Sequence, residues 1–184
     1  MPSVLFVCTA NRFRSPLAAA MFSRALEQEK DSDIVSAIRR AGAWRVSSAG
    51  TWATPGWPAL PEVVQVAETF GLDLRDHSAT RVDAQLLSEY DLILVMQASQ
   101  KEALLAEFPF VEDYVYLFSY VVERNSYDIP DTFGSEQEVA EVAAEMDELI
   151  RRGLRYIAVL AVALHNQRER DHEWKPGDKS IEAS

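Results

Sequence analysis

The chain is short of cysteine and of long apolar runs. Its 184 residues include one cysteine, Cys8. A single thiol excludes a disulfide within the chain and a thiolate metal cluster, and it is typical of a reducing compartment. The longest apolar run, residues 156–164, is far shorter than the roughly 20 residues of a membrane-spanning helix. Because the residues before Cys8 also lack the basic region of a signal peptide, we expect a cytoplasmic protein with no membrane partner.

Basic residues are also scarce, with 18 Lys and Arg against 29 Asp and Glu and a net charge of -11. Such a chain repels nucleic-acid backbones, so no nucleic-acid partner is expected. An anion-binding site must therefore be a local exception. The hydrophobic fraction of 48% is typical of a globular protein and sufficient for the core of one domain, which excludes a disordered chain.

Apolar β-prone segments alternate with helical segments along the chain, which indicates a parallel α/β sheet. We expect strands at residues 4–7, 45–49, 91–96 and 114–118, and helices from Pro16, over 62–70, over 99–108 and from near Ser135. Ligands of such sheets bind beyond the carboxyl ends of the strands, which is where Cys8 lies. The polar residues 166–184 predict a flexible tail after a domain of residues 1–165.

The stretch CTANRFRSP connects the first strand to the helix at Pro16, and in it five residues separate Cys8 from the pair Arg14 and Ser15. Such a loop can turn its backbone N–H groups inward and cradle an anion at a helix N-terminus. The forked guanidinium of Arg14 suits two phosphate oxygens. These surroundings favour the thiolate form of Cys8, a nucleophile toward a bound phosphoryl group. A free cysteine is more often a small buried hydrophobe, but this pattern between strand and helix indicates a phosphate-binding loop.

The loop resembles the phosphate-binding loop of the low-molecular-weight protein tyrosine phosphatases. The resemblance covers residues 3–165 and continues in the segments VSSAGT (46–51), GLDLRDHSA (71–79), YDLILVM (90–96) and DIPDTFG (128–134). It implies a three-layer α/β/α fold with a four-stranded parallel sheet and helices on both faces. It also implies hydrolysis of phosphotyrosine in proteins without a metal or cofactor.

The resemblance further implies three catalytic residues. Cys8 attacks phosphorus to form a cysteinyl-phosphate, Arg14 holds phosphoryl oxygens, and Asp131 protonates the leaving group, with Asp128 as the competing acid. The phosphate-binding residues are then Thr9, Ala10, Asn11, Arg12, Phe13, Arg14 and Ser15.

Support for this loop is implied at four positions, Asn11, Ser15, Ser48 and His77. Ser15 assists the thiolate, and asparagine at position 11 tolerates left-handed backbone angles. Trp52 and Phe133 match the aromatic walls that hold a substrate ring.

Five positions depart from the family pattern. Ala10 replaces a glycine, and its methyl group strains the loop if positive φ is required. Arg12 replaces an aliphatic residue, or the threonine of related arginine phosphatases, and either adds charge at the pocket mouth or points to solvent. Phe13 replaces a second cysteine, so no protective disulfide forms with Cys8. Thr132 replaces a proline after the acid, and Gln97 replaces an aspartate beneath the loop.

Three alternative functions follow from the same residues. Arsenate reduction needs further cysteines, which the chain lacks. A protein arginine phosphatase shares the nucleophile and the fold. A non-catalytic phosphate-binding module fits the departures, but such a module has no need of a general acid at Asp131.

Overall fold

Four parallel strands form the centre of the protein, and the computed structural model describes residues 1–29, 43–132 and 135–173. The strands are β1 (Ser3–Cys8), β2 (Arg45–Gly50), β3 (Leu92–Val95) and β4 (Val115–Leu117). Their order across the sheet is β2-β1-β3-β4, and every pair is parallel. The four predicted strands are therefore confirmed, and β1 lies inside the sheet with a partner on each side.

Strand β1 is buried on both faces. Val4 and Phe6 belong to one hydrophobic cluster, whereas Leu5 and Val7 belong to another on the opposite face. All four side chains are fully buried. Because successive strand residues point to opposite faces, an unbroken apolar run such as this one requires a layer of structure on each side of the sheet.

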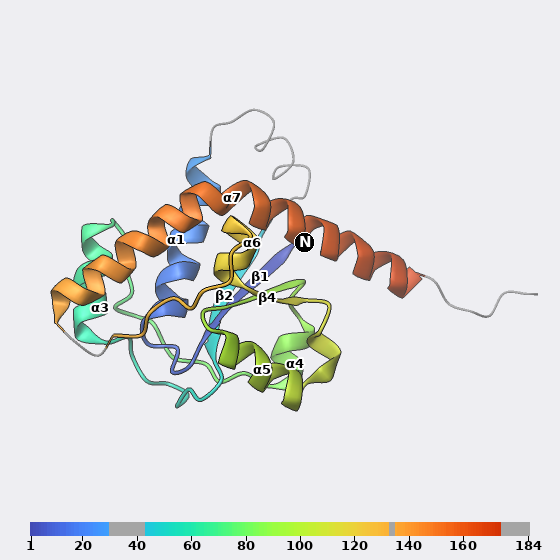
Figure 1. Ribbon diagram of the computed structural model, residues 1–184, viewed down its shortest axis with the longest axis horizontal. Coiled ribbons are helices and arrows are strands. Elements are labelled where there is room, and N and C mark those ends of the chain that lie inside the picture. The colour runs from blue at the N-terminus through green and yellow to red at the C-terminus, as the bar shows by residue number, and fades with distance from the viewer. Residues whose placement is uncertain (30–42, 133–134, 174–184) are drawn as a thin grey trace, which may run out of the picture.

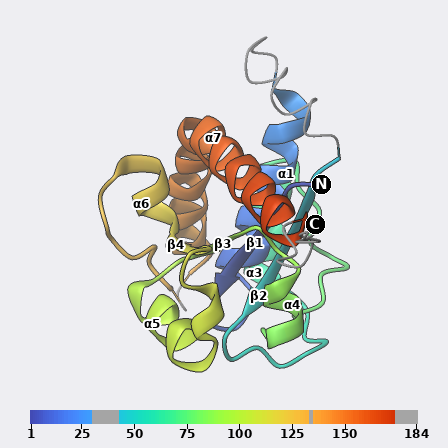
Figure 2. The same cartoon turned by 90° about the vertical axis from the view of Figure 1, so that its right-hand side faces the viewer.

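Helices supply both layers, as Figure 2 shows. On one face lie α1 (Arg14–Gln28), α3 (Pro61–Thr69), α6 (Phe118–Glu123) and α7 (Glu136–Glu173). On the other lie α4 (Ala84–Ser88), α5 (Ala98–Glu107) and the 3₁₀ turn η1 (Pro109–Val111). The predicted three-layer α/β/α fold is confirmed (Figure 1).

Two of these helices, α4 and α6, have no counterpart in the sequence-based prediction. Helix α4 contains a single buried residue, Leu87, and α6 starts at Phe118, which was expected to end the last strand. Helices of five or six residues are too short to show a 3.6-residue hydrophobic period. They form because their few apolar side chains complete the core.

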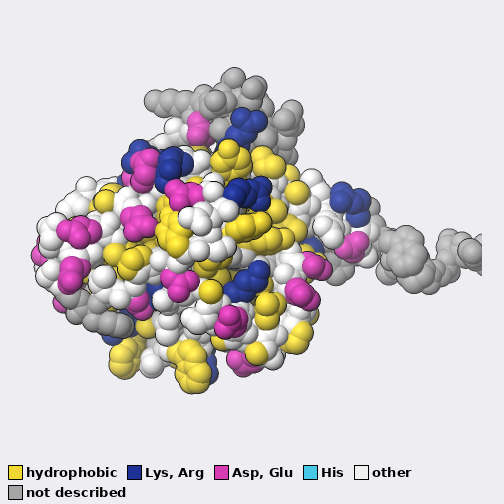
Figure 3. Space-filling model, in the orientation of Figure 1, with side chains coloured by type: hydrophobic (Ala, Val, Ile, Leu, Met, Phe, Trp, Pro, Cys, Tyr) yellow, Lys and Arg dark blue, Asp and Glu magenta, His cyan; other side chains and the backbone are white. Residues whose placement is uncertain are grey.

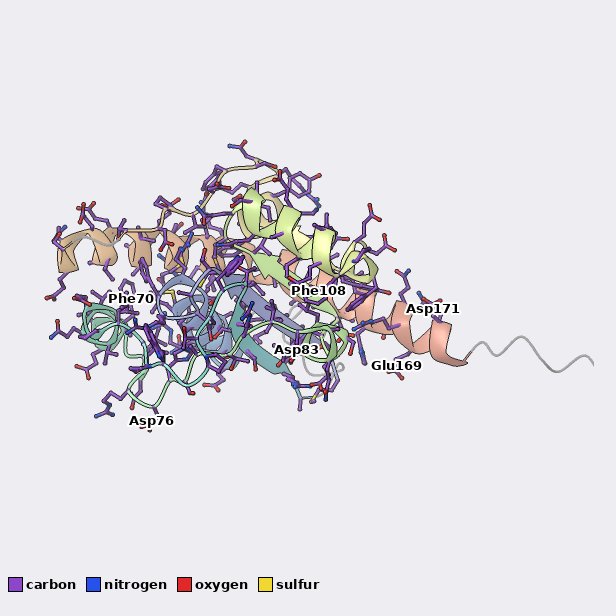
Figure 4. All side chains as sticks on the ribbon, turned by 90° about the horizontal axis from the view of Figure 1, so that it is seen from below. Phe70, Asp76, Asp83, Phe108, Glu169 and Asp171 are labelled. Carbon is purple, nitrogen blue, oxygen red and sulfur yellow. The ribbon has the colours of Figure 1, made fainter. Side chains whose placement is uncertain are left out.

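Helix α7 continues to Glu173, so residues 166–173 are helical where a flexible tail was expected. Figure 4 shows Glu169 and Asp171 on the end of α7 that projects beyond the rest of the molecule. Residues 174–184 lie outside the described residues, and the domain boundary at 165 stays a prediction.

A buried carboxylate anchors this part of α7 to the sheet. Asp91 Oδ2 accepts hydrogen bonds from the backbone N and Oγ of Ser3, at 2.9 and 2.8 Å. His165 Nδ1 lies 3.3 Å from the same oxygen, and Arg168 Nη1 lies 3.8 Å from Asp91 Oδ1. The Met1 amino group lies 2.8 Å from His165 Nε2. Polar residues near the end of the chain thus have partners that sequence proximity does not show.

One face of the molecule carries a patch of half-exposed apolar residues over α6 and the middle of α7 (Figure 3). Tyr120, Tyr156 and Val159 contribute to it, and Arg124 lies 5.8 Å from the Tyr120 ring centroid. Although α7 is long, none of the helices described here is apolar enough over a sufficient length to span a membrane.

We predict that Asp91→Ala lowers the free energy of unfolding by about 3 kcal/mol, because it leaves the buried Ser3 amide without its acceptor and removes the carboxylate that faces Arg168. Urea unfolding followed by tryptophan fluorescence measures this change. Glu148→Ala is the control. It removes exposed ion pairs to Arg151 and Arg152 and should cost less than about 1 kcal/mol. Equal losses in the two variants would contradict the anchoring role of Asp91.

Candidate active site

Cys8 is the last residue of β1 and lies at the carboxyl end of the sheet, only 3% exposed. The loop that follows leads directly into α1, which begins at Arg14, two residues before the expected start at Pro16. The backbone N–H groups at a helix N-terminus lack partners within the helix and carry partial positive charge. The predicted connection of strand, loop and helix is therefore present, and it places the thiol next to an anion-attracting helix end.

Two hydrogen-bonding groups surround the sulfur. The backbone N of Asn11 donates to Cys8 Sγ at 3.3 Å, and Ser15 Oγ lies 3.0 Å from the same atom. Ser15 Oγ also lies 3.1 Å from the carbonyl oxygen of Ala49, so its single proton can be given to either acceptor. Donors at these positions stabilise negative charge on sulfur.

Asn11 holds the loop in shape. Its backbone is left-handed, with φ of 55°, which asparagine tolerates better than most residues. Its Nδ2 donates to Ser48 Oγ at 2.8 Å and to Ser15 Oγ at 2.9 Å. Its Oδ1 accepts from the backbone N of Thr80 at 2.8 Å, and His77 Nε2 lies 2.7 Å from its carbonyl oxygen. The structure thus brings together all four residues of the predicted supporting network.

The expected strain at Ala10 is not found. Among the described residues other than glycine, only Asn11 and Arg124 have positive φ. The restrictive position is Gly50 at the end of β2, where an added Cβ would lie 2.5 Å from the carbonyl oxygen of Thr9 and 2.9 Å from the backbone N of Asn11. The close contact therefore requires glycine at position 50 in the neighbouring strand, and position 10 in the loop itself can carry a side chain.

Arg14 connects the loop to a second segment, the residues between α6 and α7. Its side chain is 1% exposed. Nη1 donates to the carbonyl oxygen of Ile129 at 2.9 Å, and Nη2 donates to Asp131 Oδ2 at 2.5 Å. The remaining donor, Nε, is buried and has no partner within the described part of the chain. An oxyanion in the adjacent pocket would satisfy it.

That pocket is a cavity of about 120 Å³ with Arg14 and Asp131 in its lining. The rest of the lining is Leu60 and five other residues of the loop, Cys8, Thr9, Ala10, Arg12 and Phe13. Nowhere in the described ranges do three or more His, Cys, Asp or Glu side chains gather in a group able to hold a metal ion.

The two candidate acids have different surroundings. Asp128 Oδ1 accepts from the backbone N of Ala98 at 2.8 Å and so binds the N-terminal turn of α5. Asp131 faces Arg14 and the pocket. Between them, Ile129 is fully buried, and its backbone N donates to the carbonyl oxygen of Met96 at 2.8 Å. This anchor fixes Asp131 near the pocket and leaves Asp128 outside it.

Tyr127 stays uncharged in this segment. Desolvation by burial, followed by a hydrogen bond with Glu123, raises the pKa of its phenol to about 12. Its carbonyl oxygen accepts a 2.6 Å hydrogen bond from Ser119 Oγ. The segment is thereby attached to α6.

Gln97, which stands where the family usually has aspartate, caps α5 together with Gln100. The Gln100 side chain is nearly buried, and its Oε1 accepts from the backbone N atoms of Met96 and Gln97 at 3.0 and 3.1 Å. Its Nε2 donates to Thr9 Oγ1 at 3.1 Å. Gln100 thus ties the end of β3 to the phosphate-binding loop. Nothing in the local sequence pattern indicates this role, since an isolated glutamine in a helix is usually solvated.

Arg12 does not point freely into solvent. Its Nε donates to the carbonyl oxygen of Pro58 at 2.7 Å, and its guanidinium carbon lies 4.9 Å from the centroid of the Trp57 ring. Its carbonyl oxygen accepts from the backbone N of Leu60 at 3.0 Å. The loop around Trp57 therefore holds the Arg12 cation beside the pocket.

Neither of the two predicted aromatic walls is placed at the pocket by the described residues. Trp52 is 74% exposed and is not among the lining residues, although its backbone N donates to the carbonyl oxygen of Thr9 at 2.9 Å. Phe133 lies outside the described residues. Their role as walls stays a prediction.

A model of the family "Low molecular weight phosphotyrosine protein phosphatase" matches residues 3–163. The chain belongs to this family. The match includes β1, the phosphate-binding loop, the supporting network and the segment that carries Asp131. The resemblance seen in the sequence is therefore confirmed over nearly the whole chain.

Relatives in this family have different described activities. A "probable low molecular weight protein-tyrosine-phosphatase EpsP" from Ralstonia nicotianae is 33% identical over 152 residues, 83% of this chain and 90% of that protein. A "protein-arginine-phosphatase" from Bacillus subtilis is 28% identical over 150 residues, 81% of this chain and 92% of that protein. A crystal structure of a YwlE mutant from Bacillus subtilis covers 85% of this chain and 99% of its own, with 27% identity and a TM-score of 0.74.

We predict that Gly50→Ala lowers kcat/KM for para-nitrophenyl phosphate roughly 100-fold, because its Cβ displaces Thr9 and Asn11, and a shift of about 1 Å at a site costs that much. Steady-state kinetics measure the loss. Gly153→Ala is the matched control, since its Cβ contacts Val122 side-chain atoms between α6 and α7. It should alter stability and leave kcat/KM within about twofold. A fully active Gly50→Ala variant would contradict the close contact.

Proposed function

We propose that the chain hydrolyses phosphotyrosine in proteins through a cysteinyl-phosphate intermediate, without a metal or cofactor, in the cytoplasm. The observation that carries the proposal is the Arg14 guanidinium, buried in the same pocket as Cys8 with one donor unpaired. Asp131 pairs with only one of the guanidinium nitrogens, and the buried Nε is left for an entering oxyanion, since a buried donor is costly to leave unpaired. The single cysteine and the family match support the remaining parts of the proposal.

In the first step, the Cys8 thiolate attacks phosphorus in line with the phenolic oxygen of the substrate. An S–P bond forms, and the P–O bond to the tyrosine breaks. Arg14 and the loop N–H groups from Thr9 to Ser15 hold the equatorial oxygens, on which transition-state charge accumulates. Asp131 in its protonated form gives its proton to the departing phenolate.

In the second step, a water molecule attacks the phosphorus of the cysteinyl-phosphate. Asp131, now a carboxylate, takes a proton from that water, the S–P bond breaks, and inorganic phosphate leaves. The developing negative charge on Cys8 Sγ is stabilised by Ser15 Oγ and by the backbone N of Asn11, the two donors nearest to the sulfur. The enzyme then returns to its starting state.

Arginine phosphatase activity is the second candidate, since a relative of similar coverage has that description. The position of Arg12 favours phosphotyrosine. Its guanidinium lies at the pocket, where it would repel the cationic side chain of a phosphoarginine. A non-catalytic phosphate-binding module is less well supported, because Asp131 faces the pocket as an acid should.

The first test compares turnover of phosphotyrosine, phosphoarginine and phosphoserine peptides. We expect phosphotyrosine to be hydrolysed fastest. Cys8→Ser should abolish turnover and keep phosphate binding, whereas Arg14→Ala should lose both, because it removes the buried cation. Kinetics and calorimetric titration with inorganic phosphate provide the measurements. A preference for phosphoarginine would keep the mechanism and change the substrate, and binding without turnover would favour the module.

We predict that Asp131→Asn slows hydrolysis of phenyl phosphate about 100-fold, within the range of general acid catalysis, and slows para-nitrophenyl phosphate much less. Nitrophenolate is a good leaving group and needs little protonation. Asp128→Asn is the matched control and should leave the hydrolysis of both substrates unaltered, since Asp128 binds the Ala98 amide outside the pocket. Equal losses of Asp131→Asn on both substrates would exclude Asp131 as the acid.

A further inference from the structure

Two arginines beside the pocket, Arg12 and Arg81, have no carboxylate partner in the part of the chain that the structure describes. Each is held by an aromatic ring instead, Arg12 by Trp57 and Arg81 by Trp52. This is unexpected in a chain with 11 more acidic than basic residues, where a free carboxylate is rarely far from an exposed cation. We call Arg12 and Arg81 the arginine rim.

Arg12 is fixed so that its charge remains available. Its Nε is bound to the carbonyl oxygen of Pro58, and its guanidinium lies 4.9 Å from the Trp57 ring centroid. No described residue accepts a hydrogen bond from its two terminal amino groups, and the residue lines the same pocket as Cys8. A cation placed in this way can bind an anion that enters together with the phosphoryl group.

Arg81 is exposed, and its guanidinium carbon lies 5.8 Å from the Trp52 ring centroid. Trp52 is itself bound through its backbone to Thr9 of the phosphate-binding loop. The nearest acid in the sequence, Asp83 (Figure 4), accepts a hydrogen bond from the backbone N of Leu86 at 2.7 Å and caps α4. The Arg81 cation therefore lies beside the loop with no carboxylate partner among the residues described.

We propose that the arginine rim recognises acidic side chains next to the phosphorylated residue of the substrate. The inference rests on the proposed function, since it concerns the sequence around the phosphotyrosine. The phosphoryl group enters the pocket at Cys8 and Arg14. Carboxylates of neighbouring substrate residues remain outside, where Arg12 and Arg81 bind them.

Because salt limits the distance over which charges interact, two arginines are sufficient to attract an acidic substrate to this site. The overall charge of -11 repels an acidic substrate, but salt screens that repulsion beyond about 8 Å under physiological conditions. Contacts at the rim lie within this distance and persist. Stacking on Trp57 and Trp52 restricts each guanidinium before the substrate binds, so less side-chain entropy is lost on recognition.

The test measures kcat/KM for matched peptides in which phosphotyrosine is flanked by glutamates or by glutamines. In 50 mM salt we expect the glutamate peptide to be preferred about tenfold, which corresponds to about threefold for each exposed pair. Arg12→Gln or Arg81→Gln should each lower this ratio to about threefold, and the double variant to about one. In 0.5 M salt the preference of the unchanged protein should largely disappear.

The ratio between the two peptides is taken within each variant, so an effect of Arg12→Gln on turnover itself cancels. Arg12→Lys and Arg81→Lys keep the charge and should retain most of the preference. Arg124→Gln is the matched control, because Arg124 also lies against an aromatic ring without a carboxylate partner, but over α6. It should leave the ratio unchanged.

Two failures are distinguishable. If both phosphotyrosine peptides are hydrolysed equally by the unchanged protein, or if its preference survives in the double variant, the arginine rim has no role in selection and the proposed function still stands. If neither peptide is hydrolysed while para-nitrophenyl phosphate or phosphoarginine is, the proposed function itself is wrong, and the inference is overturned with it.

Discussion

The side-chain amide of Asn11 is the interaction on which the active site depends most. It joins three segments that are distant in the sequence: its own loop through Ser15, strand β2 through Ser48, and the segment before α4 through the backbone of Thr80. The backbone of Asn11 is left-handed, and its N–H donates to the Cys8 sulfur. One residue thus fixes both the curvature of the loop and a donor to the nucleophile.

Arg14 extends this framework across the sheet. It follows β1, yet it binds Ile129 and Asp131, more than 110 residues later in the chain. The parallel sheet makes this contact possible, since the carboxyl ends of β1 and β3 lie at one edge and Ile129 is attached to the end of β3 through Met96. Cys8 and Asp131 therefore share a pocket because the segments that carry them meet at one sheet edge, in accord with the usual location of ligands in such folds.

Electrostatics separates the site from the rest of the surface. The protein is strongly acidic, but Arg12, Arg14 and Arg81 lie at or beside the pocket. Arg14 is buried, and its proposed partner is the phosphoryl group, whereas the proposed partners of the arginine rim are the substrate residues that surround that group. At physiological ionic strength these local charges outweigh the distant acidic residues, because screening removes the latter's influence.

The sequence by itself determined the sheet, the order of the main helices and the position of the loop with Cys8 and Arg14, and it predicted site roles for Asn11, Ser48, His77 and Asp131. Strands, loop signals and a spaced motif are local patterns, and the resemblance added the distant partners. Only the tertiary structure decided that Asp131 and not Asp128 faces Arg14, that Gly50 is the position without room for a side chain, and that Gln100 holds Thr9. It also showed that α7 continues past residue 166, where it contacts Asp91 next to β3, and that Trp52 lies against Arg81. Each of these depends on which atoms of distant segments meet, and hydrophobic period and residue type do not specify such contacts.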